Sequence, residues 1–203
     1  EIVSPYGQSS TQLDATYEQL NAALGFKTSP VTGLWFNIYG GYQDLKNNLA
    51  SAAIANYSGS YLQLLQGNMH NIYAGAEASY SYKDIISFTA SGIYRDWKTA
   101  KTENNSGDQL LYYMPSFEAN FKVDIRPVSS VLINLGYQHI TREKIGNERV
   151  DPVGNLYLGG SYEVFEGISI YVRANNLLNK DYQYYPGYPT EGINFMGGVS
   201  FRF

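Results

Sequence analysis

Apolar and polar residues alternate along this chain with a period of two, and this pattern constrains the fold more than any other feature of the sequence. Between positions 116 and 125 the apolar residues occupy every second position: Phe117, Ala119, Phe121, Val123 and Ile125. Successive side chains of a β-strand point to opposite faces, so the pattern predicts a strand with one apolar and one polar face.

Nine segments of the chain carry this alternation. They span residues 16–27, 34–46, 69–82, 85–98, 110–125, 129–142, 153–165, 168–178 and 193–203. Most exceed the five or six residues of an average strand. They match the roughly 9–11 residues that a tilted strand needs to cross a bilayer.

The connections between these segments alternate in length. Short ones at 28–33, 83–84, 126–128 and 166–167 take turns with longer, polar ones at 47–68, 99–109, 143–152 and 179–192. Hairpins that are short at one end and long at the other are typical of an outer-membrane β-barrel, with periplasmic turns and extracellular loops.

Composition excludes several classes of protein. The net charge is −4 and no basic block occurs, which argues against a nucleic-acid partner. The chain has no cysteine, so disulfide and thiolate metal sites are excluded. No apolar stretch approaches the roughly 20 residues of a membrane helix.

A soluble β-sandwich also alternates, and two further features favour a membrane barrel over it. The predicted polar faces carry charges at mid-strand, at Glu77, Glu118, Lys122 and Arg173. The predicted apolar faces contain many alanines and glycines, which lipid chains can cover but which a dry core must fill with large partners.

Nine is an odd number of strands, and this bears on whether the chain can form a complete barrel. Single-chain bacterial barrels have an even number of strands with both termini in the periplasm. We therefore expect the chain to begin inside a larger barrel, with residues 1–14 in an extracellular loop. The alternative is a tenth strand at 1–13 or 60–67, which would complete a small barrel.

The C-terminal residues resemble the end of TonB-dependent receptors. The stretch runs from Asn175 to Tyr182 as N-N-L-L-N-K-D-Y and continues with P-G-Y-P at 186–189 and a last strand ending in Phe203. A looser likeness covers residues 17–27 and 34–47.

This resemblance implies that residues 1–203 are the C-terminal portion of a barrel domain of about 22 strands. The plug domain of such receptors is absent from this sequence. Its implied partners are outer-membrane lipid, the remaining strands and plug of the same receptor, the TonB system acting through that plug, and an unidentified nutrient ligand. Phe201 and Phe203 would form the C-terminal signal for the barrel-assembly machinery.

Ligand specificity is expected in the long loops. Four tyrosines of the last loop are the candidate ligand-binding residues: Tyr182, Tyr184, Tyr185 and Tyr188. They could instead anchor at the outer headgroups or pack the loop. No cofactor, metal site or catalytic residue is expected, because the two histidines, His70 and His139, lie in no recognisable catalytic motif.

The resulting prediction is an all-β antiparallel transmembrane barrel segment of about 9–10 strands. The resemblance implies a bacterial outer-membrane receptor that imports a scarce nutrient of the siderophore, haem, cobalamin or oligosaccharide class. Three alternatives stay open: a small complete barrel with a structural or passive-pore role, a soluble ligand-binding β-domain, and an outer-membrane hydrolase.

Overall fold

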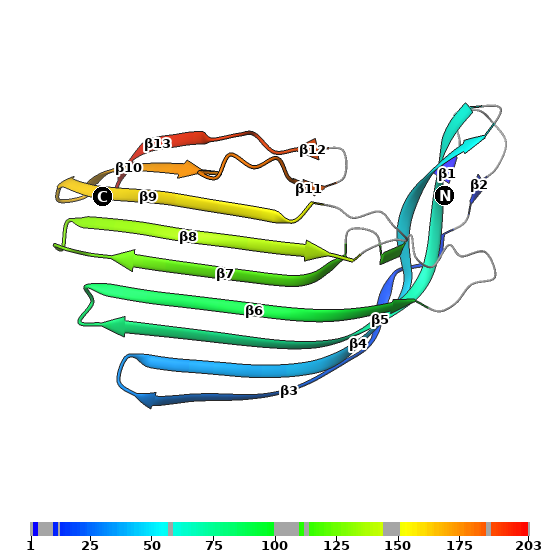
Figure 1. Cartoon of the computed structure of the whole chain (residues 1–203), viewed down its shortest axis with the longest axis horizontal. Helices are drawn as coiled ribbons and strands as arrows, with labels where there is room; N and C mark the ends of the chain where they lie inside the picture. Colours follow the sequence, from blue (N-terminus) through cyan, green and yellow to red (C-terminus); the bar gives the residue numbers. More distant parts are fainter. Residues whose placement is uncertain are drawn as a thin grey trace.

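The computed structural model describes residues 2–3, 10–11, 13–56, 59–99, 110–111, 114–143, 151–185 and 188–202. Its main element is one antiparallel sheet of nine strands that follow each other in chain order (Figure 1). The strands are β3 (Tyr17–Val31), β4 (Leu34–Asn56), β5 (Gly59–Tyr82), β6 (Ile86–Thr99), β7 (Pro115–Ile125), β8 (Val131–Arg142), β9 (Val153–Phe165), β10 (Ile168–Asn175) and β13 (Asn194–Phe201).

Two pairs of very short strands stand outside this sheet. β1 (Ile2–Val3) pairs with β2 (Ser10–Thr11), and β11 (Gln183–Tyr185) pairs with β12 (Tyr188–Pro189). The strand expected as an alternative within residues 1–13 is therefore, in its described part, a separate two-stranded hairpin rather than a tenth member of the sheet.

The nine predicted strands are confirmed, with four corrections. Residues 47–68, expected as a loop, extend β4 and β5 into a long hairpin whose pairing continues to Asn56 and Gly59. The apolar run within 60–67 belongs to β5 and is no extra strand. β7 begins at Pro115 rather than at 110, and residues 176–178 form a turn after β10.

The two ends of the sheet differ as predicted. The short turns and the C-terminal end of β13 lie at one end of the sheet, and the strand ends to which the long connections attach lie at the other (Figure 1). We call these the short-turn end and the long-loop end. The short turns use left-handed backbone at Gly33 (φ 83°) and Gly167 (φ 81°), which glycine adopts without steric cost.

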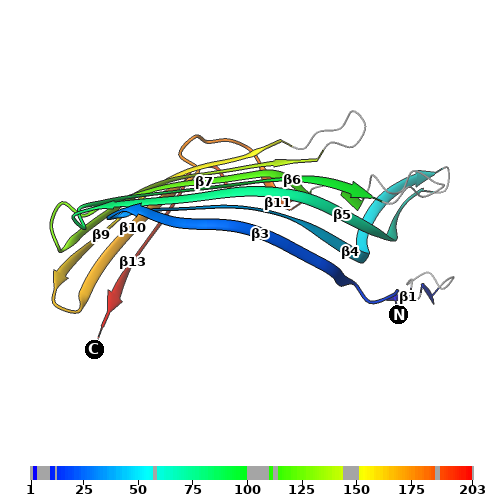
Figure 2. The same ribbon diagram turned by 90° about the horizontal axis from the view of Figure 1, so that it is seen from below.

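The sheet is a single curved and twisted layer (Figure 2). β3 and β13 are its edges, so the sheet is not closed within the described residues. The buried apolar residues there are few: Met69, Trp97, Leu110, Ala119, Val153 and Tyr182. A second sheet or helical layer that would bury either face is not present in this part of the chain.

Glycine 167 gives a direct test of the turn geometry. A Cβ on Gly167 would lie 2.6 Å from the carbonyl oxygen of Arg202 and would force a left-handed conformation on alanine. We expect Gly167→Ala to lower the free energy of unfolding by about 1–3 kcal/mol, measured by urea titration. The control is Gly160→Ala in the adjoining β9, where the nearest atom, the Leu132 carbonyl oxygen, is 3.5 Å away. Equal losses in both variants would contradict this account.

Candidate functional site: the two faces of the sheet and its long-loop end

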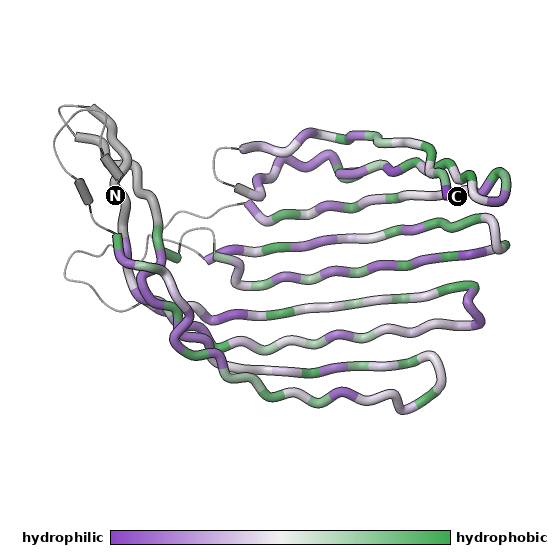
Figure 3. The backbone as a smooth tube through the Cα atoms, turned by 180° about the vertical axis from the view of Figure 1, so that it is seen from behind, coloured by the Kyte–Doolittle hydropathy of each residue, from purple (hydrophilic) through white to green (hydrophobic). Residues whose placement is uncertain are grey.

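One face of the sheet is apolar across all nine strands, and we call it the apolar face. The cross-strand ladder places Ala90 beside Phe121, Phe121 beside Tyr137 and Ile170 beside Val199. These side chains are not covered: Phe121 is 53% exposed, Val199 53% and Phe201 61%. Figure 3 shows apolar and polar residues interspersed along the strands. Within the described part of the chain no second sheet covers these residues.

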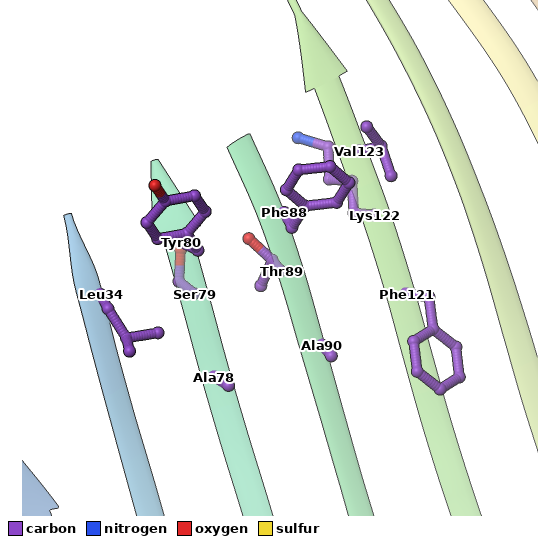
Figure 4. Close-up of a pocket in the computed structure, with 10 residues that line it drawn as sticks. All are labelled: Leu34, Ala78, Ser79, Tyr80, Phe88, Thr89, Ala90, Phe121, Lys122 and Val123. Atoms are coloured by element: carbon purple, nitrogen blue, oxygen red, sulfur yellow. The ribbon is translucent and has the colours of Figure 1, made fainter. Parts of the chain in front are cut away.

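The apolar face is shallowly hollowed where small residues lie among large ones. One depression of about 240 Å³ spans four strands, with Ala78 and Ala90 flanked by Leu34, Tyr80, Phe88 and Phe121 (Figure 4). Its lining is nearly all apolar, and its floor is set by the two alanines. Such a groove fits flexible hydrocarbon chains, which fill irregular surfaces that rigid side chains leave open.

Aromatic residues on the apolar face lie toward both ends of the strands. Tyr82 and Tyr162 are near the short turns, and Tyr94 is toward the long-loop end; each is about half exposed. This arrangement is typical of the aromatic girdles that lie at the two interfaces of a membrane barrel.

The opposite face, which we call the polar face, carries the charges predicted at mid-strand. Arg95 and Glu118 form an ion pair between β6 and β7, and Lys122 pairs with Asp124 at 2.8 Å. Arg173 lies 4.1 Å from the ring centroid of Tyr157. Each cation thus has a partner on the same face.

Amides extend this network between strands. Asn71 Nδ2 donates to Gln43 Oε1 at 2.8 Å, and Gln43 Nε2 donates to Glu18 Oε1 at 2.8 Å. Tyr73 Oη donates to Asn21 Oδ1 at 3.2 Å. A face satisfied in this way can border water or another polar domain.

At the long-loop end the polar face is covered by an apolar cluster that sequence reasoning missed. Met69 (1% exposed) and Trp97 (7%) pack against Leu110 (5%), which folds back from the connection between β6 and β7. The indole Nε1 of Trp97 donates to the Pro115 carbonyl at 2.9 Å. The available signal was the apolar run at 110–114 inside an otherwise polar connection.

The connection between β10 and β13 is organised by Asn176, which is buried at 1% exposure. Its Nδ2 donates to the carbonyls of Lys180 (2.9 Å) and Glu191 (3.0 Å), and its Oδ1 accepts from the Lys180 amide (3.1 Å). Its φ of 50° is a left-handed conformation that asparagine tolerates. One side chain therefore joins both arms of the loop.

Arg142 holds the same loop against the end of β8. Its Nη2 donates to the carbonyls of Gln183 (2.9 Å) and Tyr184 (3.1 Å), and the residue is 8% exposed. Tyr184 Oη donates to Gln138 Oε1 at 2.7 Å, on the polar face. The last loop thus folds over the polar face at its long-loop end. Sequence reasoning quoted Asn176 within a motif without assigning it this role, and it missed Arg142.

The four candidate tyrosines do not form one surface. Tyr182 is 4% exposed and packs edge-on against Tyr184, with ring centroids 5.5 Å apart. Burial, followed by the neighbouring Tyr184, raises the pKa of Tyr182 to about 12, so its phenol stays neutral. Tyr184 is 37% exposed and Tyr188 75%. The side chain of Tyr185 lies outside the described residues.

The structure places the remaining candidate residues at separate positions on the sheet. Phe201 lies on the apolar face, and Phe203 lies outside the described residues. His70 and His139 project on the apolar face beside Tyr42 and Tyr137 and are far apart along the sheet. Among the described residues no group of three His, Cys, Asp or Glu side chains could hold a metal ion. No helix in this part of the chain is long and apolar enough to cross a membrane.

Comparison with solved structures identifies the fold. The copper transporter OprC superposes with a TM-score of 0.70 at 18% identity over 90% of this chain. The FrpB iron transporter from Neisseria meningitidis gives 0.67 at 15% identity over 90%, and a mutant of the ferric enterobactin receptor PfeA from Pseudomonas aeruginosa gives 0.66 at 16% over 94%. The fold is that of part of a TonB-dependent receptor barrel.

The chain spans about a third of the length of these TonB-dependent receptors: 31% of OprC and FrpB and 32% of PfeA. No protein-family model and no curated protein matches the sequence. The three structures named are described as two transporters and a receptor.

Asn176→Asp tests the organisation of the last loop. Aspartate keeps the size and the tolerance of a left-handed backbone but replaces two donors with acceptors that face carbonyl oxygens. We expect local opening of the loop to become easier by about 2 kcal/mol, seen as roughly 30-fold faster amide exchange at Thr190, whose N–H donates to the Tyr182 carbonyl. Asn120→Asp on the polar face, where the side chain is exposed, is the control. Unchanged exchange in the Asn176 variant would refute the role of this side chain.

Proposed function

We propose that this chain is the C-terminal part of the barrel of a TonB-dependent receptor in the bacterial outer membrane, which imports a scarce nutrient. One observation carries the proposal: a single antiparallel layer exposes a continuous apolar face on one side and a paired, charged face on the other. In a bilayer the first face contacts hydrocarbon, and the second lines a lumen.

The apolar face is too extensive for a protein surrounded by water. Monomeric soluble proteins rarely expose contiguous apolar patches beyond a few hundred Å². Here the exposed apolar side chains run from Leu24 on β3 to Phe201 on β13. The strand lengths, the girdle tyrosines and the difference between the two ends support the same environment.

The sheet edges require further strands. Open edges are not tolerated in hydrocarbon, because their amide and carbonyl groups would lack partners. β3 and β13 therefore need the remaining strands of the receptor, which supports the proposal that residues 1–203 act as one portion of a larger barrel domain. The ion pairs of the polar face suit contact with the plug, through which the TonB system would act.

The nutrient is proposed only as a class. OprC is a copper transporter, PfeA a ferric enterobactin receptor and FrpB an iron transporter, and this chain shares their fold. A siderophore, haem, cobalamin, an oligosaccharide or a metal ion would meet the long-loop end first. Tyr184 and Tyr188 are exposed aromatic residues among the described part of the last loop, and we propose them as ligand contacts, with Tyr182 as their packing support.

Transport gives the test of this function. In cells that produce the full-length protein, uptake of radiolabelled ferric siderophores, haem, cobalamin, oligosaccharide and copper is compared with uptake in a deletion strain. We expect deletion to reduce uptake of one class at least tenfold, and an uncoupler of the proton gradient to abolish the difference. An uptake rate that is proportional to the external concentration and unchanged by the uncoupler would favour the passive-pore alternative.

Membrane insertion has its own test. Phe121→Arg places a charge at the middle of the apolar face, where a bilayer imposes a cost of roughly 2–4 kcal/mol. We expect the assembled, heat-modifiable form on unheated gels to decrease strongly. Asn120→Arg, one position away on the polar face, should assemble normally. If both variants assemble equally well, the apolar face does not meet lipid.

A further inference from the structure

Four tyrosines of the polar face each lie over a glycine of the adjacent strand. In every case the two residues are direct cross-strand partners: Tyr39 with Gly75, Tyr73 with Gly41, Tyr157 with Gly136, and Tyr171 with Gly198. Their repetition across three strand pairs calls for a physical reason.

Each ring occupies the space that a side chain would need at the glycine. A Cβ on Gly41 would lie 2.6 Å from Tyr73 Oη, and one on Gly198 would lie 2.5 Å from Tyr171 Oη. Cβ atoms on Gly75 and Gly136 would overlap ring atoms of Tyr39 and Tyr157. The glycine is thus a socket that admits the ring of its partner and that any larger residue would close.

β4 and β5 carry two such pairs in opposite directions. Tyr39 on β4 covers Gly75, and two positions along the ladder Tyr73 on β5 covers Gly41. The two rings meet edge-on, with centroids 6.5 Å apart and planes at 62°. We call these four residues the tyrosine–glycine clasp.

The alternation of apolar and polar residues does not by itself prevent a two-residue slip between paired strands. A one-residue slip would turn every side chain to the wrong face, so the apolar pattern forbids it. A two-residue slip keeps every side chain on its proper face. On the polar face, however, it would move Tyr39 from Gly75 onto either Tyr73 or Glu77 and leave the sockets unfilled.

The hairpin turn does not fix the register at this point. The β4–β5 ladder changes register between Leu45 and Asn48, so pairing set near the tip of the hairpin is not transmitted unaltered to the clasp. In a barrel the register determines the stagger of the strands and through it the diameter. A local determinant of register on the sheet side of this irregularity is therefore needed.

We propose that Tyr39 and Tyr73 are positioning residues that set the β4–β5 register by excluding two-residue slips. Each fits only opposite its own glycine, so the native register is the one in which both sockets are filled. The pairs Tyr157–Gly136 and Tyr171–Gly198 repeat the device at β8–β9 and β10–β13.

Disulfide trapping can read the register directly, because the chain contains no cysteine. Asn37 and Glu77 are direct partners on the polar face, so Asn37→Cys/Glu77→Cys reports the native register. Asn37→Cys/Ser79→Cys reports a slip in one direction, and Trp35→Cys/Glu77→Cys reports a slip in the other. Each cysteine pair is introduced into the full-length protein and oxidised after assembly in the outer membrane.

Three backgrounds are compared. We expect Tyr39→Ala/Tyr73→Ala to raise the ratio of slipped to native cross-link about tenfold. Tyr39→Phe/Tyr73→Phe keeps the rings and should retain the parental ratio. The exchange Tyr39→Gly/Gly75→Tyr moves one ring to the partner strand and restores a ring-and-glycine pair, so it should also retain the native cross-link.

The outcomes decide the proposal in each case. A parental ratio in the alanine background, or an equal rise with phenylalanine, would overturn it. If the alanine variant does not assemble at all, the Tyr39→Gly/Gly75→Tyr exchange variant tests the proposal. Native cross-linking in the exchange variant would support the role of the clasp, and failure of the exchange variant to assemble would refute that role.

Discussion

The whole structure depends on one constraint: a single hydrogen-bonded layer must satisfy its backbone in its own ladder while leaving one apolar face for its surroundings to cover. The nine strands achieve the first part by pairing in chain order. The second part is visible in Phe121, Val199 and Phe201, which are each more than half exposed. Burial away from water is the usual source of stability for such side chains, and in the proposed membrane setting hydrocarbon takes that role.

The polar face follows from the same constraint, because its charged groups must be paired or hydrated on the other side of the layer. Arg95 with Glu118 and Arg173 over Tyr157 meet this need within the sheet. At the long-loop end two connections fold over this face, one through Leu110 and one through Arg142 and Asn176. A receptor would use this end to contact its ligand, so the fixed loops there connect folding with the proposed function.

Much of this fold was accessible from the sequence, because period-two alternation and connection length are local properties. β7 illustrates this, since its apolar positions identify both the strand and its exposed face. Strand pairing that depends on residues distant in the chain could not be predicted from the sequence. The β4–β5 extension was predicted as a loop, yet its two strands pair with each other up to Asn56 and Gly59, which only the partner strand reveals.

The candidate site shows the same division. The tyrosines of the last loop were found from their density, but the burial of Tyr182 depends on contacts with Tyr184 and Thr190 that the sequence does not reveal. Asn176 acts through carbonyls up to fifteen residues away. The tyrosine–glycine pairs are likewise invisible until the register is known.

The orientation of the sheet in the membrane is the central claim, and a nitroxide scan along β7 measures it most directly. Single cysteines at positions 116–125 are spin-labelled in the assembled protein, and collisions with oxygen and with a water-soluble nickel chelate are compared. The account predicts oxygen maxima at Phe117, Phe121 and Val123 and nickel maxima at Glu118, Asn120 and Lys122. Equal access of the nickel chelate to both sets, or exclusion of both reagents from Phe117 and Phe121, would contradict it.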